Sequence, residues 1–182
     1  MKFANLAIAV TAAGALSACA SASTAASRSD VPKLEVPPLS MAGFTGKPCR
    51  VFGVDQLGSL GITAPGAPDP EQFTARCRWT DGKATTIGIS LFGESQGLAR
   101  VYAAKEAFPY FKPTEVAAYP AVDRDTAQGT TGTCSTVVGI ADGAAFEIEV
   151  DVDDQASADY TAPCAVSKHV AEIALANIKG GG

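Results

Sequence analysis

The clearest pattern in the chain is a strict alternation of apolar and acidic residues in its last quarter. Between positions 145 and 153, four apolar residues alternate with four acidic ones: Phe146, Glu147, Ile148, Glu149, Val150, Asp151, Val152 and Asp153. Side chains on a strand point alternately to its two faces, so this segment predicts a strand with one buried and one solvated face. Segments 75–79 and 84–92 also alternate, and Asp81-Gly82 between them favours a hairpin turn.

Three other segments carry apolar residues at helical spacing, namely 51–60, 95–108 and 164–178. Gly61 suits the end of the first helix, and Pro109 stops the second. Two more strands are predicted by shorter apolar runs, at 119–122 and 134–140. The order of these elements predicts an α+β fold, with an antiparallel sheet of about five strands packed with about three helices.

The first eighteen residues have the pattern of an export signal. Lys2 precedes an apolar run from Phe3 to Ala15, which spans about 20 Å as a helix and is too short for a ~30 Å hydrocarbon core. The run ends in Leu16-Ser17-Ala18-Cys19, which resembles the bacterial lipobox of a leucine and two small residues before a cysteine. The resemblance implies cleavage before Cys19, diacylation of that cysteine, and a lipid-anchored protein on the extracytoplasmic face of the cell membrane.

Composition divides the chain into four parts. Residues 1–18 form the signal peptide, and residues 19–46 form the lipidated cysteine with a flexible tether rich in Ser, Ala, Thr and Pro. Residues 47–179 form a single globular domain, and 180–182 form a glycine tail. The formal net charge of −5 argues against nucleic acid as a partner, since nucleic acid selects clustered basic residues.

The cysteines of the domain indicate disulfides. Apart from Cys19, the chain has an even number of them: Cys49, Cys77, Cys134 and Cys164. In an exported chain this predicts two disulfides, with three possible pairings. We favour the pairing of the first with the second and of the third with the fourth, since each bridge then stays within one half of the domain and ties a helix start to a strand. No two of these cysteines lie within about 25 residues of each other, so zinc is not favoured, and we expect neither metal nor cofactor.

The cysteine motifs together carry a resemblance to a known family. They are Pro48-Cys49 before a helix, Cys77-Arg78-Trp79 on a strand, Cys134 ahead of two apolar runs, and Pro163-Cys164 before the last helix. This set resembles the actinobacterial lipoprotein family catalogued as domain of unknown function 3558, over Pro48 to about Ile178. The family has no established activity, so the resemblance supports export, anchor and disulfides and implies no catalytic residue.

Two segments are candidate binding sites. The acidic row Glu147, Glu149, Asp151 and Asp153 is interpreted as a solvated face, a docking site for a basic partner, or a metal site. Same-face carboxylates on a strand are about 6.7 Å apart, so they do not converge on one calcium ion. Arg76 and Arg78, on the outward face of their own strand, are expected to lie across the same sheet from them.

The second candidate is the aromatic segment 108–113, which contains Phe108, Tyr110 and Phe111. It is interpreted either as a binding edge, because aromatic rings supply contact area, or as a loop folded onto the core.

Catalysis is not favoured by the remaining residues. His169 is the only histidine, and the residues around Ser90 lack the second glycine of a nucleophile elbow. We therefore expect a non-catalytic module that binds an envelope protein or a small ligand. The alternatives are an envelope hydrolase that uses carboxylates of the acidic strand, and a structural or shielding envelope protein.

Overall fold

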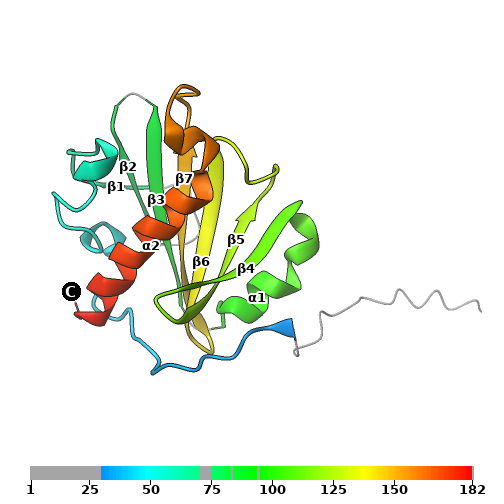
Figure 1. Ribbon diagram of the computed structural model, residues 1–182. Coiled ribbons are helices and arrows are strands. Elements are labelled where there is room, and N and C mark those ends of the chain that lie inside the picture. The colour runs from blue at the N-terminus through cyan, green and yellow to red at the C-terminus, as the bar shows by residue number, and fades with distance from the viewer. Residues whose placement is uncertain (1–29, 70–74, 83, 94, 182) are drawn as a thin grey trace, which may run out of the picture.

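The computed structural model describes residues 30–69, 75–82, 84–93 and 95–181, so the predicted signal peptide and Cys19 lie outside the described residues. The described residues form a seven-stranded antiparallel sheet in the order β1-β2-β3-β7-β6-β5-β4 (Figure 1). The strands are β1 Ala67–Pro68, β2 Ala75–Thr80, β3 Thr85–Phe92, β4 Tyr110–Val116, β5 Tyr119–Asp125, β6 Thr133–Ala141 and β7 Ala144–Val152. The helices are α1 Leu98–Ala103 and α2 Pro163–Lys179, with short 3-10 turns η2 Pro48–Arg50, η3 Gly58–Leu60, η4 Lys105–Ala107 and η5 Ala158–Thr161.

The prediction of about five strands and about three helices is wrong. In the part of the chain that the structure describes, the sheet has seven strands and α2 is the one long helix. Segment 51–60 forms bends and the turn η3 in place of a helix, because Gly53 and Gly58 weaken helical conformation within it. The predicted helix 95–108 shortens to α1 followed by η4.

The aromatic segment, expected to be a loop, leads directly into strand β4. Pro113 lies inside this strand, which is why a strand was not predicted there. The proline is tolerated because β4 is at the edge of the sheet. A proline has no backbone N–H to donate, and at an edge no further strand needs that hydrogen bond. The second unpredicted strand, β1, has only two residues, beside β2 at the other edge.

The predicted alternation in β7 is confirmed and organises the two faces of the sheet. The apolar residues Phe146, Ile148, Val150 and Val152 are all buried in the main core. They share this core with the apolar stripe of α2, which crosses β6 and β7 (Figure 1). Residues at a spacing of four, such as Val166, Val170 and Ala174, form the stripe.

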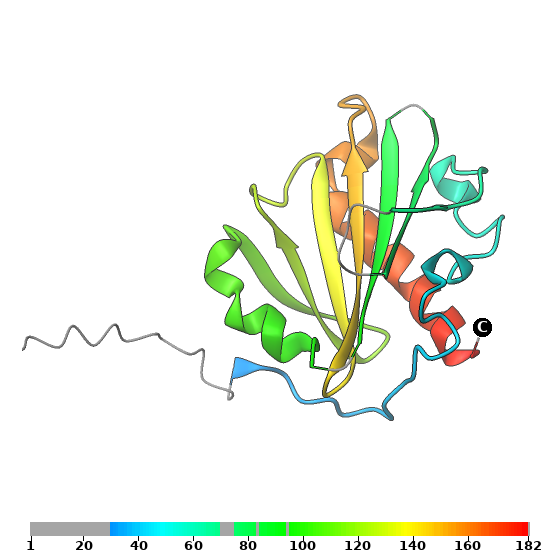
Figure 2. The ribbon, with the colours of Figure 1, turned by 180° about the vertical axis from the view of Figure 1, so that it is seen from behind.

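A smaller apolar cluster lies on the opposite face, where α1 packs against one corner of the sheet (Figure 2). Leu98, Val101 and Tyr102 of α1 pack there with residues of β5, β6 and β7. A Cβ atom at Gly139 would lie 2.7 Å from Leu98 Cδ1, so only glycine permits this close approach. The rest of this face, over the centre of the sheet, carries polar residues.

Both favoured disulfides are present. Cys49 is bonded to Cys77, which ties η2 to β2, and their Cα atoms are 5.1 Å apart. Cys134 is bonded to Cys164, which ties β6 to the start of α2, with a Cα separation of 5.0 Å. Each bridge closes a loop of about 30 residues, whose loss of entropy in the unfolded chain corresponds to about 3–4 kcal/mol of stability.

Residues 31–46, which we call the N-terminal strap, pack against the domain, so the prediction of a flexible tether up to residue 46 is wrong for them. The backbone N–H of Leu39 donates to Ile140 O at 2.9 Å, and the Tyr119 hydroxyl donates to Pro37 O at 2.8 Å. Met41 and Phe44 are buried in the main core. The apolar residues of the strap have no helical or strand period, which is why the sequence pattern did not reveal a folded segment.

No helix in the described ranges is long and apolar enough to cross a membrane.

The strap supplies a testable prediction. Phe44 is 2% exposed, so Phe44→Ala should lower the free energy of unfolding by about 3 kcal/mol, measured by urea denaturation of the mature protein. Val54→Ala is the control, because Val54 is 66% exposed and its truncation should change stability by less than about 0.5 kcal/mol. Equal stability of the two variants would mean that the strap is not part of the folded unit.

Candidate functional site

The candidate site lies on the face of the sheet turned away from α2. We call this surface the polar face and define it by the outward residues of the five central strands: Arg76, Arg78, Thr86, Gly88, Ser90, Arg124, Thr133, Ser135, Glu147, Glu149 and Asp151. They share a face because residues paired across neighbouring strands point to the same side of the sheet. Arg124 of β5, for example, is paired with Ser135 of β6, which is paired with Glu149 of β7.

An ion pair between β5 and β7 is the shortest of the ion pairs described on the polar face. Arg124 Nη2 and Nε donate to the same oxygen, Glu147 Oε1, at 2.8 and 3.2 Å. The guanidinium also lies over the ring of Phe108, 4.4 Å from its centroid. The Arg124 and Glu147 side chains are only 15% and 12% exposed, so the pair is shielded from water more than a typical surface pair.

A second ion pair joins β2 and β7. Arg76 Nη2 lies 3.1 Å from Glu149 Oε1, and the Arg76 side chain is 10% exposed. The side chain reaches Glu149 by passing over Gly88 of β3, where a Cβ atom would lie 2.8 Å from Arg76 Nη2. Asp69 is shared between the two arginines of β2, with its Oδ2 3.7 Å from Arg76 Nε and 3.3 Å from Arg78 Nη2. The expectation that Arg76 and Arg78 lie on the same sheet face as the acidic row is confirmed.

A groove of about 330 Å³ is hollowed beside the Arg124–Glu147 pair, and we call it the Arg124 groove. It is lined by Phe108, Arg124, Asp125, Thr126, Thr133, Cys134, Ser135, Glu147 and Glu149. The lining contains three carboxylates and one guanidinium, a formal charge of −2. Asp125 is already held in place, since it accepts hydrogen bonds from Gly129 N and Thr133 Oγ1. The groove is therefore polar, rich in hydroxyls and acidic.

The acidic row does not behave as one uniform solvated face. Glu147 and Glu149 are bound by arginines and line the groove, whereas Asp151 is exposed at the next same-face position of β7. Burial raises the pKa of Asp151, the negative charges of Asp153 and Glu149 raise it further, and Arg78 lowers it. Asp153 lies past the end of β7, and its backbone N–H donates to Ala84 O at 2.7 Å.

Only one ring of the aromatic segment reaches the groove. Phe108 lines it, but Phe111 packs edge-on against Tyr102 with ring centroids 5.2 Å apart. Tyr110 lies against Gly129, where a Cβ atom would be 2.4 Å from the tyrosine ring. The interpretation as a loop therefore does not hold for Tyr110 and Phe111, which are half-buried residues of strand β4, and Phe108 alone stands at a candidate site.

Sequence reasoning missed Arg124, which joins the two candidate segments by contacting both Phe108 and Glu147. The strand was predicted only over 119–122, because Asp123-Arg124-Asp125 reads as a charged turn. The alternation of charge within these three residues was the available signal, since in a strand it places the arginine on the face opposite to the two aspartates.

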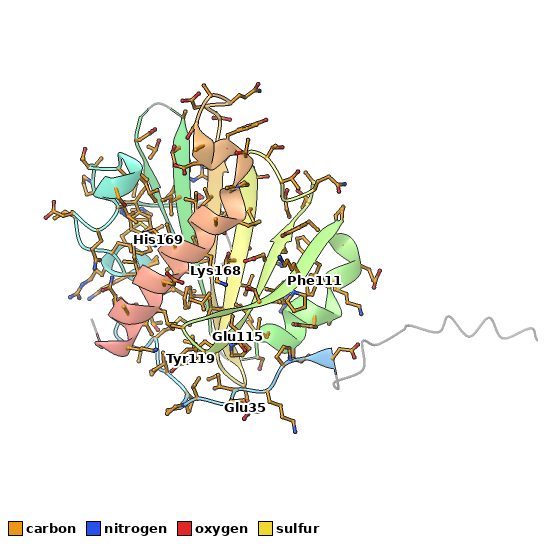
Figure 3. All side chains as sticks on the ribbon, in the orientation of Figure 1. Glu35, Phe111, Glu115, Tyr119, Lys168 and His169 are labelled. Carbon is orange, nitrogen blue, oxygen red and sulfur yellow. A yellow bond between two sulfur atoms is a disulfide. The ribbon has the colours of Figure 1, made fainter. Side chains whose placement is uncertain are left out.

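A second polar cluster lies under α2. Thr136 Oγ1 donates to Asp123 Oδ1 at 2.8 Å and lies 2.7 Å from Ser167 Oγ. Lys168 Nζ donates to Thr114 Oγ1 at 3.0 Å (Figure 3). Asp123 is 7% exposed, and burial raises its pKa, while the Thr136 hydrogen bond and the charges of Lys168 and Lys112 act in the opposite direction.

His169 belongs to neither cluster. It follows Lys168 on α2 (Figure 3), its side chain is 56% exposed, and its Nδ1 lies 3.9 Å from Glu172 Oε2. Among the described residues, no group of three or more His, Cys, Asp or Glu side chains is arranged to hold a metal ion.

The chain belongs to the family described as Protein of unknown function (DUF3558), whose model matches residues 13–177. The match therefore spans the strap, both disulfides and the Arg124 groove. No curated protein and no solved structure matches the chain.

The shielded ion pair predicts measurable coupling. Arg124→Met and Glu147→Gln should each lower the free energy of unfolding by about 1–3 kcal/mol, because each leaves its polar partner poorly solvated. The double variant should be more stable than the sum of the two losses predicts, by about 1 kcal/mol in urea denaturation.

The matched control for this cycle is the exposed pair of Lys105 and Asp30, at 3.9 Å. Its cycle, Lys105→Met with Asp30→Asn, should show coupling of at most about 0.5 kcal/mol. If the coupling energy in the Arg124–Glu147 cycle is no larger than in this control, the Arg124–Glu147 pair is not a shielded ion pair that stabilises the fold.

Asp123 predicts a pH dependence. Because its pKa in the folded protein is raised above its unfolded value of about 3.9, the folded state holds the proton more tightly. Its contribution to stability is thus complete below about pH 3.9 and is lost as pH rises through the folded pKa. Asp123→Asn should flatten this fall when unfolding free energies are compared between pH 4 and 7. The exposed Asp142→Asn should keep the wild-type slope, and an unchanged slope in Asp123→Asn would refute the assignment.

Proposed function

We propose that this protein is a lipid-anchored lipoprotein of the extracytoplasmic membrane face, which binds a partner protein at the cell envelope through the Arg124 groove without catalysis. The observation that carries the proposal is the convergence of the two segments singled out by sequence, since Phe108 and the carboxylates Glu147 and Glu149 line one groove. The anchor is supported by the lipobox-like Leu16-Ser17-Ala18-Cys19.

The state of the carboxylates supports binding over hydrolysis. A general base needs a carboxylate free to accept a proton from a reacting group. Glu147 and Glu149 are each engaged by a guanidinium, and Asp125 accepts two hydrogen bonds. These contacts preorganise the groove as a recognition surface and favour the binding module over the hydrolase.

The short chain between Cys19 and the described structure supports a position of this surface close to the membrane. Eleven peptide units separate Cys19 from Asp30, where the described structure begins, and even fully extended they reach about 40 Å at most. A lipid on Cys19 would therefore keep the polar face within one domain diameter or so of the headgroups, where the partners are other envelope components.

The anchor is tested by Cys19→Ser, which should prevent lipidation and leave the protein as uncleaved precursor or released into the medium. Phase partitioning with detergent and gel mobility measure this result. Ser17→Ala keeps a small residue before the cysteine and should remain lipidated. A mature-sized Cys19→Ser protein that still partitions into detergent would rule out the lipid anchor.

The groove is tested in cells that produce the protein with a photo-crosslinking amino acid in place of Thr126, an exposed residue of the groove lining. Thr126 should yield a discrete adduct that mass spectrometry identifies as an envelope protein. The control position is Glu172, exposed on α2 on the other side of the sheet. If both positions yield the same adducts, or Thr126 yields none, the groove is not a binding site.

A further inference from the structure

The outward carboxylates of β7 follow a repeating pattern of guanidinium binding. Glu147 receives Arg124 from β5, which lies on the far side of β6. Glu149 receives Arg76 from β2, across Gly88 of β3. In both cases the arginine comes from two strands away, and over β3 the absence of a side chain at Gly88 leaves room for it.

Asp151 is the next outward carboxylate of β7, and within the described ranges no cation lies at ion-pair distance from it. Its neighbours on the adjacent strands are Thr86 and Thr133, whose hydroxyls leave room above the strand without supplying a charge. Arg78 is turned toward Asp69, with Nη2 and Oδ2 3.3 Å apart. Asp151 is thus the position of the pattern that lacks its guanidinium.

Asp151 is continuous with the Arg124 groove. Thr133 lines the groove and is also the cross-strand neighbour of Asp151, so the carboxylate stands at the rim. When Asp151 is added to the lining charge of −2 and Arg76 is counted because it is bound to Glu149, the groove with its rim has a formal charge of −2. The charges of Asp153 and Glu149 add to the negative potential at Asp151 and raise its pKa, whereas the charge of Arg78 offsets part of that effect.

We propose that a basic segment of a partner protein docks along the Arg124 groove and places an arginine on Asp151. This rests on the proposed function and names the chemistry of its partner. Arginine is favoured over lysine because its planar fork matches a carboxylate, and because both occupied positions of the same strand already hold guanidinium groups. A protein is favoured over a small cation because Asp151 is exposed at a rim, where only a covering surface would exclude water from the pair.

The test uses the full-length protein in detergent and a fluorescent twelve-residue peptide of alternating arginine and serine, with binding followed by anisotropy. Asp151→Asn should weaken binding about three- to fivefold at 20 mM salt, as expected for loss of one rim ion pair, and Asp151→Glu should restore most of it. The effect should disappear at about 500 mM salt because exposed charges are then screened. The matching lysine peptide should bind more weakly and lose less on Asp151→Asn.

The control is Asp142→Asn, which removes an equal charge from an exposed turn outside the polar face and should change binding by less than about 1.5-fold. Equal losses in the two variants would show attraction to net charge alone and overturn the proposal. So would wild-type affinity of Asp151→Asn, or no binding of the arginine peptide. If the Thr126 crosslink still captures a partner in any of those cases, the binding function stands and only the arginine assignment fails.

Discussion

The structure depends on how strand β7 satisfies two opposite environments in the middle of the sheet. Its inner residues, such as Phe146 and Ile148, complete the core under α2, so the strand cannot turn its carboxylates elsewhere. Those carboxylates are then held on one sheet face, where the Glu147 side chain is only 12% exposed and its charge without a partner would be unfavourable. Arg124 and Arg76 resolve the conflict, and Gly88 on the intervening strand β3 leaves Arg76 room to reach Glu149. The shape and charge of the groove follow from this compensation.

The sequence predicted the parts of the fold that have a strong local period. The β2–β3 hairpin, β7 and α2 all follow from alternation or helical spacing, and the disulfides follow from the even number of cysteines in the two halves. The prediction failed where tertiary contacts override local pattern. Strand β4 was lost because Pro113 suggested a loop, and the strap was lost because its apolar residues have no period.

The candidate site was predictable by residue type and only partly by position. Glu147, Glu149 and Phe108 were expected to bind a partner, and they do line one groove. Three other predicted residues do not line it. Tyr110 packs against Gly129, Phe111 packs against Tyr102, and Asp153 lies beyond the end of β7. Arg124 could be placed only by pairing β5 with β6, since nothing in its own segment indicates that it crosses to β7.

The strap would have a mechanical consequence if the proposed lipid on Cys19 ties the N-terminus to a membrane. Tension applied from that end first loads the strap, whose attachments include the Leu39–Ile140 and Tyr119–Pro37 hydrogen bonds and the burial of Phe44. Both disulfides follow the strap in the chain, so the sheet and α2 stay cross-linked when the strap is pulled away, but the main core then loses Met41 and Phe44. Tension would therefore lengthen residues 31–46 first and lower the stability of the domain that remains.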